Sequence, residues 1–213
     1  KAIRRQRQMC IRDRKMRDGV DGWGNTNWYD KVYGTGTRTH HNISATGGSD
    51  RVRFFASIGY LNEDGNIDNY GYNRLNLRSN IDAKLTKSLT FTLGVSGRIE
   101  KRDSPRYSAN PDDWHNVPQQ VIRALPYVPD TYEYEGKTYN VSTPTASSPV
   151  APLASINESG YSKSNYSYIQ SNFSLKYDAP WLKGLSFKFQ GAYDLTYNFS
   201  KILSNPYEVM IMN

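Results

Sequence analysis

Hydrophobic and polar residues alternate over six segments of the chain, which is the pattern of β-strands with two different faces. In the clearest segment Val52, Phe54, Ala56 and Ile58 alternate with residues such as Arg53. Together the six segments cover residues 41–45, 52–60, 75–85, 89–100, 169–177 and 185–197. Because successive side chains of a strand point to opposite faces, each segment is predicted to have one apolar and one polar face.

The lengths of these segments and of their connections favour strands that cross a membrane. Most of the alternating runs last 9 to 13 residues, whereas ordinary strands average about 5–6 and a tilted strand needs about 9–11 to cross a bilayer. The connections alternate between short ones at 47–50, 86–88 and 179–184 and longer ones at 62–71 and 101–165. Outer-membrane barrels combine short periplasmic turns with long extracellular loops in the same way.

Tyrosines on the predicted apolar faces support the same interpretation. Tyr60, Tyr177, Tyr193 and Tyr197 are predicted near strand ends, where barrels carry aromatic girdles at the membrane interfaces. The predicted fold class is all-β: part of a large antiparallel transmembrane β-barrel, with about six strands present. It is expected to be incomplete, because the smallest such barrels have eight strands and residues 209–213 look like the opening of another strand.

Alternation alone leaves a second architecture open. A soluble or surface β-sandwich that binds carbohydrate would also have two-faced strands. In a sandwich the apolar faces pack against one another, whereas a barrel turns them to lipid and keeps a polar lumen. The two hypotheses therefore differ in what covers the apolar faces.

Charge and composition exclude several other classes. The net charge is +7, but residues 1–18 carry eight basic and two acidic side chains, which leaves 19 basic and 18 acidic ones in residues 19–213. A nucleic-acid partner is not expected, because its binding needs a basic patch on the folded surface. The single cysteine excludes a disulfide scaffold, and no run of about 18 apolar residues predicts a membrane-spanning helix.

The N-terminal tail differs from the rest of the chain. Gln8–Arg14 resembles the translation of sequencing-adapter DNA at the end of an assembled contig. Residues 1–18 are therefore interpreted as a non-native basic tail and 19–213 as the partial barrel. Sequencing reads that cross from Arg14 into Lys15 without an adapter junction would refute this interpretation.

The connection 101–165 is too long for a structureless link in a compact domain, so local structure or function is expected there. Residues 114–125 are predicted to form a short helix ended by Pro126, and 132–139 a small hairpin turning at Gly136. Aromatic side chains favour binding surfaces because they offer a large contact area for few rotatable bonds. The candidate residues for binding substrate or a lid are Trp114, Tyr132, Tyr134 and Tyr139; Trp114 lies in Asp112–His115, which could equally be the solvated cap of the predicted helix.

No segment of the chain predicts catalysis. It lacks a carboxylate pair with interpretable spacing, a Ser–His–Asp series and a phosphate-binding glycine loop. The acidic run 62–68 misses the spacing of a calcium loop and is interpreted as a turn. His40 and His41 are adjacent and would face opposite sides of a strand. The sequence therefore predicts a protein that is not an enzyme, with no metal and no cofactor.

Five segments of the chain, taken in order, resemble the early barrel of SusC/RagA-like TonB-dependent outer-membrane transporters. They are Asn27–Asp30, His41–Gly48, Phe55–Gly65, Ala124–Pro129 and Trp181–Leu185. The resemblance covers roughly residues 23–213 and implies a barrel of about 22 strands. The plug domain and the segment that contacts TonB are not among the residues of this sequence.

The resemblance also implies partners, cargo and location. Transporters of this family import oligosaccharides or peptides, use energy delivered by TonB through the plug domain, and work with a SusD-like lipoprotein lid. They lie in the lipid of the outer membrane of Gram-negative bacteria, typically Bacteroidota. In such a protein 101–165 would be extracellular and would meet the lipoprotein lid or line the cargo chamber, unless it only shields the barrel mouth.

Overall fold

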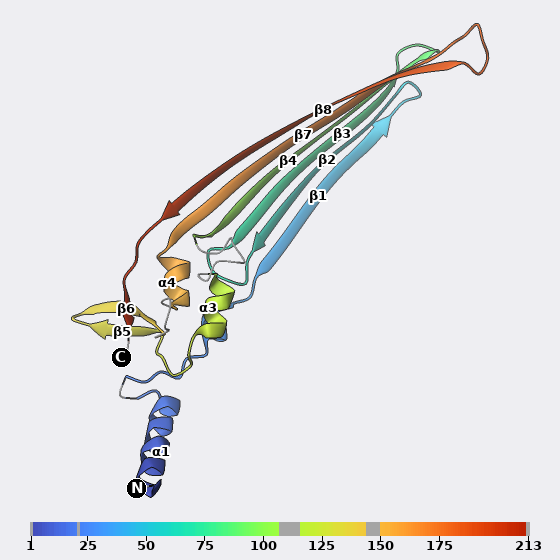
Figure 1. Cartoon of the computed structure of the whole chain (residues 1–213). Helices are drawn as coiled ribbons and strands as arrows, with labels where there is room; N and C mark the ends of the chain where they lie inside the picture. The colour runs from blue at the N-terminus through green and yellow to red at the C-terminus, as the bar shows by residue number, and fades with distance from the viewer. Residues whose placement is uncertain (1, 21, 107–115, 144–149, 212–213) are drawn as a thin grey trace.

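The computed structural model describes residues 2–20, 22–106, 116–143 and 150–211. Six long strands run side by side and form one curved antiparallel sheet (Figure 1). In sheet order they are β1 (Thr37–Gly48), β2 (Val52–Asp64), β3 (Gly71–Lys84), β4 (Leu89–Pro105), β7 (Gly160–Asp178) and β8 (Ser186–Ser204).

Each alternating segment of the sequence forms one of these strands, so the predicted fold class is confirmed. The strands are 12 to 19 residues long, which is longer than the apolar alternation alone indicated. They are extended by polar residues: Lys101–Pro105 of β4 pair with 161–165 of β7. The connection predicted at 101–165 is therefore confined to 106–159.

The strand register places apolar side chains in rows across one face, which we call the apolar face. One row contains, from β1 to β8, Ile43, Ile58, Leu77, Gly97, Ile169 and Leu195. Its large side chains are 46% to 72% exposed. The sandwich hypothesis requires this face to pack against a second sheet, whereas these side chains are exposed in the part of the chain that the structure describes.

The apolar face has the height of a bilayer's hydrocarbon band. On β4 it extends from Leu89 to Ile99, and its next residue on the same face is Lys101. Ten residues at about 3.3 Å each, tilted by about 40°, span roughly 25 Å, which is the height of the apolar band of outer-membrane barrels.

Three of the four predicted girdle tyrosines lie at the limits of this band. Tyr60 and Tyr197 occupy the row of Ile99 at one limit, and Tyr177 pairs with Leu89 at the other. The prediction for Tyr193 is wrong. Because β8 continues to Ser204, Tyr193 lies near the middle of the band, opposite Ser171.

The shorter elements gather at the end of the sheet away from the short turns (Figure 1). We call this group the apical cap; its elements are α2 (Trp28–Val32), α3 (Val117–Arg123), α4 (Pro152–Asn157), β5 (Thr131–Tyr134), β6 (Lys137–Ser142) and β9 (Val209–Ile211). Strands β5, β6 and β9 form a second, three-stranded sheet.

The remaining helix, α1 (Ala2–Asp18), contains the tail interpreted as non-native, and its residues Met9–Arg14 are exposed. The origin of the tail stays a prediction.

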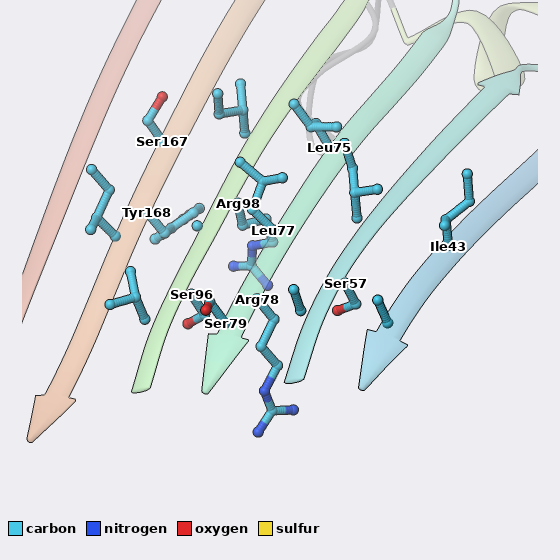
Figure 2. Close-up of a pocket in the computed structure, with 17 residues that line it drawn as sticks. Ile43, Ser57, Leu75, Leu77, Arg78, Ser79, Ser96, Arg98, Ser167 and Tyr168 are labelled. Carbon is cyan, nitrogen blue, oxygen red and sulfur yellow. The ribbon is translucent and has the colours of Figure 1, made fainter. Parts of the chain in front are cut away.

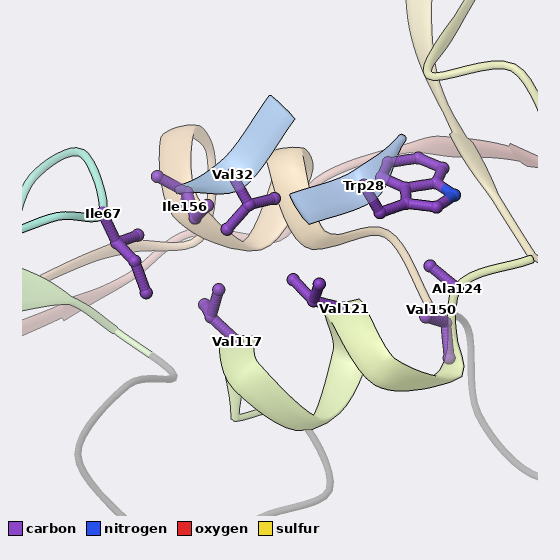
Figure 3. Close-up of a cluster of buried hydrophobic side chains, with 8 residues drawn as sticks. All are labelled: Trp28, Val32, Ile67, Val117, Val121, Ala124, Val150 and Ile156. Carbon is purple, nitrogen blue, oxygen red and sulfur yellow. The ribbon is translucent and has the colours of Figure 1, made fainter. Parts of the chain in front are cut away.

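A small hydrophobic core holds the apical cap together (Figure 3). It joins chain segments that are far apart in sequence, and its buried members are Trp28, Val32, Ile67, Val117, Val121, Ala124, Val150 and Ile156. The indole Nε1 of Trp28 donates a hydrogen bond to the carbonyl of Leu125 at 3.0 Å. The segment before β1, the β2–β3 turn and the long connection therefore fold as one unit.

The local predictions for the long connection hold in part. The hairpin is confirmed: β5 and β6 are joined by Glu135 and Gly136, which both have positive φ (50° and 76°) as a type I′ turn requires. Within the described residues the predicted helix forms over Val117–Arg123, and its first two predicted positions, 114 and 115, lie outside them. Ala124 is extended, and Pro126 disfavours a helical conformation at the residue before it.

The end of the chain differs from its prediction. Residues 209–211 form a strand, as expected, but β9 pairs in parallel with β6 of the apical cap. It therefore belongs to the three-stranded sheet rather than to the six-stranded one.

In the described residues no helix is both long and apolar enough to cross a membrane.

Two glycines before β1 test how tightly the apical cap is packed. A Cβ at Gly24 would lie 2.6 Å from the carbonyl oxygen of Val128, whereas a Cβ at Gly34 has no atom within 4 Å. We expect Gly24→Ala to destabilise the cap by about 1–3 kcal/mol through overpacking and Gly34→Ala to leave it unchanged. Limited proteolysis of 106–159 in the full-length protein measures this; equal protection in both variants would contradict the packing.

Candidate functional site

The face opposite the apolar face, which we call the polar face, is lined by hydroxyl, amide and charged groups. One of its rows contains Ser44, Ser57, Arg78, Ser96, Gln170 and Asp194 from β1 to β8. A hollow of about 480 Å³ lies on this face over β3, β4, β7 and β8, with Arg78, Asn80, Ser96 and Gln170 in its lining. This surface can hydrogen-bond a hydrophilic ligand.

A charged cluster lies on the polar face toward the apical cap. Glu100 of β4 is only 5% exposed, although it is a carboxylate. Its two oxygens contact Nε of Arg98 at 3.1 Å and a terminal nitrogen of Arg102 at 3.3 Å. Two guanidinium groups thus surround one buried carboxylate, which satisfies that charge and leaves the cluster net positive.

Another hollow, of about 770 Å³, belongs to the apolar face. Gly97, which contributes no side chain to the row of Leu77 and Ile169, is one of its lining residues, and its walls come from β1 to β4 and β7 (Figure 2). The lining is dominated by aliphatic groups such as Ile58 and Val95. Such a surface suits hydrocarbon rather than a hydrophilic cargo.

The apical cap contains a polar cleft of about 860 Å³ between β6, the end of α4 and residues 205–208. Two tyrosines and several amides and charged groups line it: Lys137, Thr138, Tyr139, Asn140, Asn157, Glu158, Asn205, Pro206, Tyr207 and Glu208. The ammonium of Lys137 lies 4.6 Å from the ring centre of Tyr139 and 3.5 Å from a carboxylate oxygen of Glu208. Aromatic rings beside amides and carboxylates are groups that can bind sugars or peptides.

The structure brings together three of the four predicted site residues. Tyr132 pairs with Tyr139 and Tyr134 with Lys137, so all four side chains lie on one face of the hairpin. Tyr132 and Tyr134 are 41% and 53% exposed, and Tyr139 lines the apical cleft. The fourth candidate, Trp114, and the Asp112–His115 segment around it lie outside the described residues.

An ion pair ties this hairpin to the segment before β1. Lys31 of α2 contacts a carboxylate oxygen of Asp130 at 2.7 Å. Partial burial alone would raise the pKa of Asp130, but the hydrogen bond and the charge of Lys31 outweigh it and lower that pKa from its ordinary value of 3.8. The pair therefore stabilises the hairpin's position when Asp130 is ionised.

The sequence alone did not predict that the residues of the charged cluster lie close together, nor that those of the apical cleft do. Alternation assigned Arg98, Glu100 and Tyr168 to polar faces, but it does not give the register that places β4 beside β7. Tyr207 and Glu208 follow the last long strand and meet the hairpin only through the pairing of β9 with β6. Among the described residues, no group of three or more His, Cys, Asp and Glu side chains is arranged to hold a metal ion.

Comparison with curated proteins finds partial matches to TonB-dependent receptors of Formosa agariphila. TonB-dependent receptor P3 is 33% identical over 84 residues, which are 39% of this chain and 8% of that protein. TonB-dependent receptor P39 is 30% identical over 74 residues, 35% of this chain and 7% of that protein. The matched segments are a small part of each receptor. No family model matches the chain.

Comparison with solved structures finds the same fold in a peptide importer. The RagAB peptide importer in its closed-closed state matches with a TM-score of 0.65 at 21% identity, over 90% of this chain and 22% of that chain. A structure of the RagAB peptide transporter gives 0.63 at 22% identity, over 86% of this chain and 21% of that chain. The chain thus spans about a fifth of the importer chain.

Sequence and structure together confirm the resemblance to SusC/RagA-like TonB-dependent transporters. They also confirm that the sheet is a piece of a large antiparallel barrel. The matched proteins are named as receptors and importers rather than as enzymes.

The Lys31–Asp130 pair predicts a pH dependence of the hairpin. Because the pKa of Asp130 is lower in the folded than in the unfolded state, the contribution of the pair is present above about pH 4 and is lost as the pH falls through the folded-state pKa. Lys31 is half exposed, so we expect less than about 1 kcal/mol. Hydrogen exchange of β5 and β6 amides, corrected for its intrinsic pH dependence, measures the loss; Asp130→Asn should abolish it, and an identical profile in that variant would refute the assignment.

Proposed function

We propose that this chain, a SusC/RagA-like barrel segment, forms part of the wall of a TonB-dependent transporter in the outer membrane of a Gram-negative bacterium of the Bacteroidota. The single observation that carries this proposal is the two-faced sheet. Its apolar face is about as tall as a hydrocarbon layer, and its opposite face is polar. The apolar face then meets lipid and the polar face lines the lumen.

The connections orient this wall in the membrane. The turns at 49–51, 85–88 and 179–185 are short, and the apical cap lies at the other end of the sheet. Short turns of outer-membrane barrels are periplasmic and long loops extracellular. The apical cap, with most of 106–159, is therefore assigned to the extracellular side.

We further propose that the apical cap takes part in cargo capture. Its exposed tyrosines and its cleft lie at the mouth of the lumen, where cargo enters. The partners in this proposal are a SusD-like lipoprotein lid on the extracellular side and TonB, which acts through the plug domain of the full-length protein. The cargo is an oligosaccharide or a peptide, because both offer polar groups and faces that tyrosines and amides can contact.

Adjacent residues of β4 test which face meets lipid. Leu93→Arg, in the full-length protein, places a charge in the apolar band and should destabilise the barrel by about 2–4 kcal/mol. Thr92→Arg is the matched control, because Thr92 faces the lumen and hydrogen-bonds Asp82 at 2.9 Å, a carboxylate that can pair with the new arginine. Folded protein is measured by heat-modifiable gel mobility after refolding into vesicles, and equal losses in both variants would refute the assignment of the faces.

The hairpin tyrosines test cargo capture. The test is restricted to side chains, because Val141 and Ser142 of the same hairpin are buried in the apical cap. Changing Tyr132, Tyr134 and Tyr139 to serine should reduce cargo uptake or co-purification of the lipoprotein by about tenfold, the typical cost of losing aromatic anchors.

The matched control is Tyr29→Ser, an exposed tyrosine of α2 that is 57% accessible and lies outside the hairpin. Both variants should assemble like the wild type. If uptake and lipoprotein binding stay at wild-type level in the triple variant, the hairpin only shields the barrel mouth.

A further inference from the structure

The polar face carries an excess of positive charge next to the apical cap. Four arginines lie there on two neighbouring strands, Arg74 and Arg78 on β3 and Arg98 and Arg102 on β4. Glu100 is the carboxylate among them, and it contacts both arginines of β4. We call these four arginines the arginine patch.

The two arginines of β3 are those that Glu100 does not neutralise. Arg74 lies opposite Glu100 in the register, yet its Nε is buried and, among the described residues, has no hydrogen-bond partner. Arg78 lies opposite Ser96, diagonal to Arg98, at the edge of the 480 Å³ hollow. Neither arginine is neutralised by Glu100, so an anion bound beside them gains a charge partner.

Tyrosines hold the arginines of β4 in place. The guanidinium carbon of Arg98 lies 4.4 Å from the ring centre of Tyr168, and that of Arg102 lies 5.5 Å and 5.4 Å from the rings of Tyr72 and Tyr166. A guanidinium against a ring keeps its in-plane N–H groups available for a carboxylate or sulfate. The two arginines of β4 are therefore held in place before an anion arrives.

The neighbours of the patch suit a saccharide. The hollow beside Arg78 is lined by hydroxyl and amide groups, including Ser96, Gln170 and Asn172, together with the carboxylate of Asp194. Such groups hydrogen-bond the hydroxyls of a sugar, whereas a peptide would also need apolar pockets for its side chains, and the lining of this hollow is mainly polar. The arrangement combines anion binding with hydroxyl recognition.

We propose that the arginine patch binds the carboxylate or sulfate groups of an acidic oligosaccharide, which makes an anionic glycan the cargo. This inference rests on the proposed function, since it takes the polar face as the lumenal wall. The patch lies near the extracellular mouth, where its positive potential raises the local concentration of an anionic cargo.

The test compares binding of dextran sulfate with binding of unsulfated dextran of the same length to the purified full-length protein. The two probes share a backbone and differ in charge. The wild type should bind dextran sulfate at least about tenfold more tightly, in a manner weakened by salt. The double variant Arg74→Gln with Arg78→Gln should bind dextran sulfate about tenfold more weakly than the wild type, because charge-assisted hydrogen bonds are lost.

Lys101→Gln, compared with Arg78→Gln alone, is the control, since each variant removes one positive charge and Lys101 lies on the opposite face of β4. Equal affinity for the two probes, or an equal loss in the Lys101 variant, would overturn the proposal while leaving the transporter assignment intact. Polyglutamate bound more tightly than dextran sulfate would overturn the saccharide assignment. Failure of the arginine variants to show heat-modifiable mobility would instead assign the patch to barrel packing, which also overturns it.

Discussion

The rest of the structure depends on the backbone pairing that holds six strands in one register. Strands β7 and β8 alone pair over 19 positions, from Gly160 with Ser204 to Asp178 with Ser186. A slip of one residue in any pair would move an entire apolar set to the other face. The pairing therefore creates both faces at once: the apolar rows of Leu77 and Leu93 and, behind them, the row of Arg78. An uncovered apolar surface of this extent is unfavourable in water, and a bilayer of matching thickness removes the cost.

The apical cap is a second packed unit beside the six-stranded sheet. Its core joins α2, the β2–β3 turn and the helices α3 and α4, which lie far apart in the sequence. A buried amide within it is paired: Gln120, which is 1% exposed, accepts from the amide of Ala151 and donates to the hydroxyl of Ser155. The described parts of the long connection, 116–143 and 150–159, are thus packed at the mouth of the proposed lumen, where binding groups need fixed positions.

The sequence predicted the strands well because alternation is local. It also predicted the hairpin, since Glu135-Gly136 suits a tight turn. It could not predict what depends on partners distant in sequence. Much of the excess length of the strands consists of residues that pair without alternating hydrophobicity, such as Lys101–Pro105 of β4. The position of Tyr193 and the pairing of β9 with β6 also depend on strand partners that are distant in sequence. The arginine patch needs the register between β3 and β4, and the core of the apical cap needs Trp28 to meet Val121 across about ninety residues of chain.

The central claim is that the two faces of one sheet meet lipid and water, respectively. The most direct measurement places single spin-labelled cysteines at each position from Leu89 to Ile99 of β4 in an otherwise cysteine-free full-length protein and reconstitutes the variants in lipid vesicles. Collision rates with lipid-soluble oxygen and with a water-soluble nickel complex are then compared along the strand. We expect both collision rates to vary with a period of two residues, with the rate for oxygen highest at odd positions such as Leu93 and the rate for the nickel complex highest at even positions such as Thr92. Accessibility that lacks this period, or two reagents that rise and fall together, would contradict it.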